Sequence, residues 1–87
     1  MSERIPKQHT HTEVISRPEA WRLAEAAQLV GGVSVRALQN EGETYSNGRG
    51  KESVVPEGNI RIRVTGSAEK VGRAHINERS IPLREAA

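Results

Sequence analysis

Cysteine and phenylalanine are absent from this chain, and Trp21 and Tyr45 are its only large aromatic residues. The absence of cysteine excludes disulfides and thiolate metal sites. No apolar run approaches the ~18 residues that a membrane span needs, and the N-terminus has no apolar signal-peptide core. We therefore expect a soluble, cytoplasmic protein that does not enter the membrane.

Apolar residues are also scarce. They make up 34% of the 87 residues, whereas globular domains have about 45–50% on a count that includes glycine. A chain of this length forms one small domain, whose core must be built from valine, isoleucine, leucine and alanine. Such a core is thin, so either part of the chain is disordered or a partner completes the burial. A homodimer is the simplest way to add a core.

Charge is unevenly spread along the chain. The formal net charge is only +2, but six basic and three acidic residues follow Gly58. Segment 39–58 is acidic, with four glutamates against Arg49 and Lys51. This asymmetry indicates an anionic partner.

Segment 17–30 carries the signals of a helix. Ser16 and Glu19 fit a capping box, and Pro18 lies in the first turn, where its missing N–H costs nothing. Gly31-Gly32 can end the helix, because glycine accepts the left-handed conformation of a C-cap. The pattern predicts a helix with one apolar stripe, formed by Ala20, Leu23, Ala24, Ala27 and Val30.

Alternation of apolar and polar residues predicts strands over 33–38 and 59–65. A shorter strand is expected over 12–15, after a flexible N-terminal tail at 1–10. The domain itself is expected to span 11–84.

Segment 39–58 is rich in glycine, asparagine, serine and glutamate. It is either a mobile polar loop or a short hairpin. In a hairpin, Asn47-Gly48 would form a type I′ turn between residues 43–46 and 51–55.

After Gly66 the alternation breaks. Ser67 is a good N-cap, which predicts a short helix over 68–77. The alternative is a returning strand, but Val71 and Ile76 would then point to opposite faces. With a last short strand at 80–83, the order of elements predicts an α+β, ferredoxin-like split βαβ fold.

The predicted strands place arginines together. Arg36, Arg61 and Arg63 would share the sheet face that the helices leave open. Like charges at such spacing repel unless an anion or acidic groups compensate them, and the planar guanidinium suits phosphate and carboxylate. We therefore expect a nucleic-acid-binding surface or one for an acidic protein, with three peripheral cations, Arg49, Lys51 and Arg73.

The alternative is a solvent-exposed sheet face with no ligand. Its arginines would pair with glutamates of segment 39–57, and the charge would deter association between sheet edges. A second class of function is a protein-interaction or inhibitor module. In that class Trp21, which lies off the apolar stripe, would contact the partner.

Two segments resemble known families. "IRIRVTGSAEKVGRA" resembles the closing strand and helix of KH-type RNA-binding domains, although Gly48-Arg49-Gly50 does not match that family's GxxG loop. "LAEAAQLVGGVSVRALQNE" looks like the helix-turn-helix of MerR-like and excisionase-like DNA-binding proteins, within residues 23–41. That resemblance implies a recognition helix in which Ser34, Arg36 and Gln39 face the major groove.

Residues of catalytic or metal-binding type are sparse. His9 and His11 stand two apart, His75 is remote in sequence, and the glutamates are scattered. Without cysteine these histidines predict no metal site, and no nucleophile–base grouping stands out. We expect a binding protein that needs no cofactor, not an enzyme.

Overall fold

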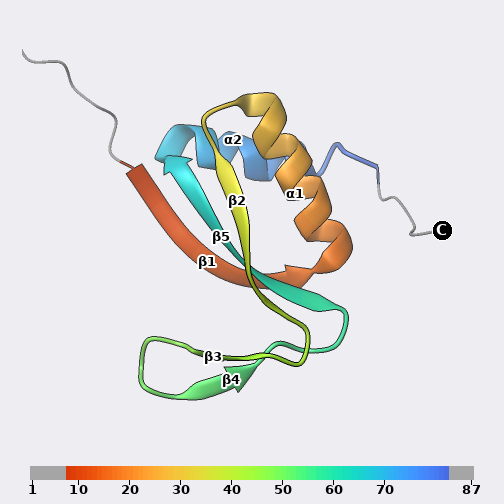
Figure 1. Ribbon diagram of the computed structural model, residues 1–87. Coiled ribbons are helices and arrows are strands. Elements are labelled where there is room, and N and C mark those ends of the chain that lie inside the picture. The colour runs from red at the N-terminus through yellow and green to blue at the C-terminus, as the bar shows by residue number, and fades with distance from the viewer. Residues whose placement is uncertain (1–7, 83–87) are drawn as a thin grey trace, which may run out of the picture.

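The structure is a computed structural model that describes residues 8–82. Its elements, in chain order, are β1 (Gln8–Ser16), α1 (Arg17–Val30), β2 (Ser34–Asn40), β3 (Thr44–Ser46), β4 (Glu52–Val54), β5 (Asn59–Ser67) and α2 (Ala68–Glu78) (Figure 1). One sheet has the order β1-β5-β2, and β3 and β4 form a separate two-stranded ribbon. Over this described part, no helix has the length and apolar character to cross a membrane.

The three-stranded sheet contains an interrupted βαβ unit. β1 and β2 both pair antiparallel with β5, so they run parallel to each other on its two sides. α1 is the crossover that connects them. The α+β class is thus confirmed, but the ferredoxin-like order is not. The last strand predicted at 80–83 does not form at 80–82, where the chain turns after α2, and Leu83 lies outside the described residues.

Both helices begin at serine caps. The Ser16 hydroxyl accepts the Glu19 amide at 3.3 Å, and the Glu19 carboxylate reaches back to Ser16, so the capping box is present. Ser67 accepts the Lys70 amide at 3.3 Å. The helix predicted at 17–30 is confirmed, and the second helix ends one residue beyond its predicted limit, at Glu78.

The core lies between the helices and one face of the sheet. Both helices cover that face (Figure 1), and the buried cluster is formed by Leu23, Ala27, Ile62, Val64, Val71 and Ala74. The predicted stripe of α1 needs one correction, because Ala26 is buried and Ala24 is exposed. The cause is the position of α1, which packs Ala26 toward α2 and leaves Ala24 facing an open space between the helix and the sheet.

Predicted boundaries also change at β1 and in the hairpin. β1 begins at Gln8, so residues 8–10 are strand, not flexible tail; residues 1–7 lie outside the described part. The hairpin alternative for segment 39–58 is correct, but its connection runs over 47–51. Ser46 pairs with Glu52 and the Asn47 amide reaches the Lys51 carbonyl at 3.1 Å. Asn47-Gly48 is therefore not a two-residue turn.

The two helices are joined by an ion pair. Arg22 Nη2 of α1 lies 3.3 Å from Glu78 Oε2 of α2, and both side chains are mostly buried. We expect Glu78→Ala to lower the free energy of unfolding by about 1–3 kcal/mol, because it leaves the Arg22 charge without its partner. Urea unfolding followed by circular dichroism measures this change. Equal stability of the variant and the wild type would contradict it.

Candidate functional site

The sheet face away from the helices, here called the open face, carries polar and basic side chains. Because side chains alternate along a strand, the register assigns to this face the residues that flank the buried Ile62 and Val64 on β5, together with the β1 and β2 residues opposite those flanking positions. They are Thr10, Thr12, Val14, Ser34, Arg36, Gln39, Arg61, Arg63 and Thr65. The open face as described contains no carboxylate.

Arg36 and Arg63 lie directly opposite each other on β2 and β5, and both are exposed. Neither takes part in any ion pair between described residues. Like charges on opposed positions of a sheet destabilise the pairing. The fold therefore holds two cations side by side without neutralising them.

Arg61, the third predicted arginine, is half-buried and oriented by its neighbours. Its Nη1 donates to Gln39 Oε1 at 2.8 Å and its Nη2 to Thr12 Oγ1 at 3.4 Å. The guanidinium carbon lies 4.5 Å from the centre of the Tyr45 ring, a cation–π contact. None of these partners is charged, so Arg61 keeps its positive charge uncompensated.

A bulge in β2 gives Gln39 its place on the open face. The register shifts between Ala37 and Gln39, so Gln39 stands opposite Arg61 and Leu38 has no partner in the register. The sequence alternation alone contained no sign of this bulge.

The hairpin brings Tyr45 to the open face. Its base is fixed by backbone hydrogen bonds from Gly42 N to Val55 O at 2.9 Å and from Val55 N to Glu43 O at 3.0 Å. Between the hairpin and the sheet is a hollow of about 430 Å³. It is lined by Thr12, Glu13, Val14, Tyr45, Ser46, Asn47, Gly48 and Arg61.

The peripheral cations fall in two places. Arg49 and Lys51 belong to the 47–51 connection of the hairpin, next to Gly48, which lines the hollow. Arg73 is on α2, beyond the other face of the sheet, and pairs with Glu69 at 3.3 Å. The structure therefore does not bring Arg73 together with the three arginines.

The glutamates of segment 39–57 do not neutralise the arginines. Glu41 Oε1 accepts the Gly58 amide at 2.9 Å, and Glu43 Oε1 accepts the Asn40 amide. No carboxylate of that segment forms an ion pair with another described residue. These side chains close the turns around the hairpin instead.

The helix-turn-helix interpretation is wrong for this chain. Residues 34–40, its expected recognition helix, form strand β2. Val35 packs against the core cluster while Ser34 and Arg36 stand on the open face. The β-branched alternation of this segment outweighed its resemblance to a helix.

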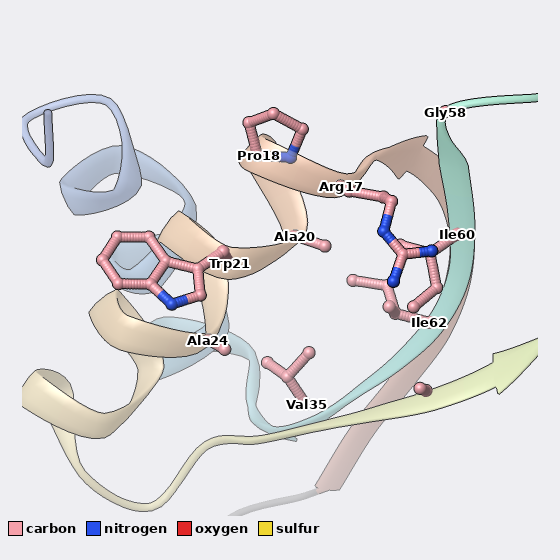
Figure 2. A pocket seen from close by; sticks show the side chains of 10 residues that line it. Arg17, Pro18, Ala20, Trp21, Ala24, Val35, Gly58, Ile60 and Ile62 are labelled. Atoms are coloured by element: carbon pink, nitrogen blue, oxygen red, sulfur yellow. The ribbon is translucent and has the colours of Figure 1, made fainter. Parts of the chain in front are cut away.

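A second surface feature is an apolar groove between α1 and the sheet, with a volume of about 860 Å³ (Figure 2). The ring of Trp21 lies at its helix side, and the side chain is 41% exposed. The groove is lined by Arg17, Pro18, Ala20, Trp21, Ala24, Val35, Ala37, Gly58, Ile60 and Ile62. It borders β2, whose outer edge pairs with no other described strand.

The sequence did not reveal that the histidines meet. The His11 and His75 rings stack with centres 5.3 Å apart, and Glu13 contacts both. His75 is thus remote in sequence only. The alternation of His9, His11 and Glu13 along one strand face was the available signal, but their distance from His75 depends on how α2 docks.

Comparison with known proteins gives no family. No family model, no curated protein and no solved structure matches this chain.

Proposed function

We propose that this protein binds the phosphate backbone of single-stranded nucleic acid on its open face. The observation that carries the proposal is the opposed pair Arg36 and Arg63, exposed and without a carboxylate partner on a face rich in hydroxyl groups. Arginine forks and threonine or serine hydroxyls are the usual donors to phosphate oxygens. A ligand phosphate would offset the repulsion between the two guanidinium groups.

Single strands suit this face better than a duplex. The described open face belongs to a strand layer and contains no helix that could enter a major groove. Tyr45, next to Arg61, is the one large aromatic side chain that contacts the face among the described residues. Binding should therefore depend mainly on backbone charge, with little base selectivity.

The salt dependence of binding tests this function. The chain should bind a fluorescein-labelled mixed-sequence oligonucleotide, with anisotropy as the readout. If the three arginines contact phosphates, the logarithm of the binding constant should fall with the logarithm of salt concentration with a slope of about −2. Absence of binding at low salt, or an affinity that does not change with salt, would reject the proposal.

A second candidate function is the binding of a protein partner in the groove. The specific observation is an apolar hollow beside β2, an edge strand of the described sheet. An extended segment could add to β2 and place an apolar side chain against Ala24 and Ala37, which are exposed in the monomer. A second copy of the chain is the partner we propose, since it would enlarge the thin core.

Ala37→Lys tests this interface. A charge in the groove should abolish self-association while leaving the fold intact, because Ala37 is exposed. Sedimentation of the wild type should show a dimer that dissociates on dilution, and its formation should shift the Trp21 emission. A wild type that stays monomeric at millimolar concentration would contradict the interface.

A further inference from the structure

His11, Glu13 and His75 form a compact cluster, here called the histidine cluster, on the helix-facing side of β1. His11 and Glu13 are two apart on the strand, so their side chains share a face. His75 comes from the last turn of α2. His11 Nε2 lies 2.8 Å and His75 Nε2 3.5 Å from the same atom, Glu13 Oε2.

These distances suit a metal ion. The potential ligand atoms of the three side chains all lie within 4.8 Å of one another. In a tetrahedral site with metal–ligand bonds of about 2.0–2.1 Å, neighbouring ligand atoms are about 3.3 Å apart. Small side-chain rotations are therefore enough to bring the two imidazoles and the carboxylate within bonding distance of one ion.

We infer that the histidine cluster is a binding site for a divalent transition metal of the Zn²⁺ type. Two imidazoles and one carboxylate are borderline ligands, which favour Zn²⁺ over the hard, oxygen-seeking Mg²⁺ and Ca²⁺. The side chains are 29–35% exposed, so an ion can enter from solvent and water can complete its coordination. The two histidines lie on the other side of the sheet from the open face, so the site includes none of the arginines of the proposed nucleic-acid surface.

The affinity of the site is limited by its surroundings. His11 Nδ1 is buried and has no hydrogen-bond partner among the described residues. A metal-binding histidine normally donates its second N–H to a carboxylate or carbonyl, and loss of that partner weakens metal binding by about 10–100-fold. We therefore expect a reversibly bound ion.

A bound ion would connect β1 to α2. α2 makes few contacts with β1 in comparison with those to α1. The core of this domain is small, and a metal that binds only the folded state stabilises it by mass action. At a hundredfold excess of Zn²⁺ over its dissociation constant, the melting temperature should rise by roughly 10–20 °C.

The test is titration of the metal-free full chain with ZnCl₂ by isothermal calorimetry, in parallel with His75→Gln and His9→Gln. The wild type should bind one equivalent. His75→Gln should weaken binding by about tenfold or more, because it removes a ligand, whereas His9→Gln, outside the cluster, should bind like the wild type. Failure of the wild type to bind overturns the inference. So does undiminished binding by His75→Gln, which would assign the ion to the strand histidines alone. An equal loss in His9→Gln would also contradict the site, because His9 lies outside the cluster.

NMR signals of the histidine rings test the site in the wild type, so this measurement does not require a variant that folds. In long-range nitrogen–proton spectra, Zn²⁺ should shift the Nε2 signals of both His11 and His75. Shifts confined to His9 and His11 would contradict the site.

Discussion

Replacing Arg36 by glutamate is expected to weaken binding to a single-stranded oligonucleotide about tenfold and, at the same time, to stabilise the fold. Loss of a charge-assisted hydrogen bond to phosphate costs about 1.5–3 kcal/mol, or roughly ten- to hundredfold in affinity. Stability should rise by about 0.2–1 kcal/mol, because the introduced carboxylate would stand opposite Arg63 and turn a repulsive cross-strand pair into an attractive one.

A fall in affinity for the oligonucleotide together with a rise in the free energy of unfolding distinguishes a binding face from a face that only contacts solvent. Anisotropy measures the affinity and urea unfolding the stability of each variant. Arg36→Glu with Arg63→Glu should remove detectable binding and lose the gain in stability, because two glutamates then repel. The matched control is Arg73→Glu, the same charge change on α2 beyond the other sheet face, which should lower affinity only slightly. Equal losses from Arg73→Glu and Arg36→Glu would show that net charge, and not the open face, determines binding.

Gly66→Ala is expected to destabilise the domain by about 1–3 kcal/mol, the usual cost of overpacking. A Cβ at this position would lie 2.9 Å from the Gly32 carbonyl oxygen and 3.1 Å from Val33 Cγ2. Gly32 and Val33, in the connection from α1 to β2, lie against Gly66 of β5, and a backbone oxygen cannot move aside as a flexible side chain can. Thermal unfolding followed by circular dichroism should show the loss as a lower melting temperature.

Gly72→Ala is the matched control for that substitution. Gly72 is exposed in the middle of α2, and a Cβ there meets nothing within 4 Å. Alanine should therefore stabilise the protein by up to ~1 kcal/mol through helix propensity. A loss of stability in Gly72→Ala, or no loss in Gly66→Ala, would contradict the described packing.

The local structure was largely predictable from sequence. The capping box and glycine pair located α1, and strict alternation located β5 and β2, because these signals act between residues close in the chain. The open face with Arg36, Arg61 and Arg63 followed from that alternation. Ser67 as a cap correctly favoured α2 over a returning strand.

The features that could not be predicted from the sequence depend on contacts between segments that are distant in the chain. The β1-β5-β2 order, the bulge that places Gln39 beside Arg61, and the cation–π contact with Tyr45 are all set by pairing across the chain. The same holds for the meeting of His75 with Glu13. The groove was missed because Ala24 was expected to be buried with the rest of its stripe.

The most direct measurement is an amide and guanidinium NMR titration of the wild type with a short single-stranded oligonucleotide at low salt. Binding at the open face predicts the largest shifts at Thr12, Arg36, Arg63 and Thr65, with α2 almost unchanged. Shifts that concentrate around Trp21 and the groove, or on the exposed side of α2, would contradict a nucleic-acid-binding sheet face.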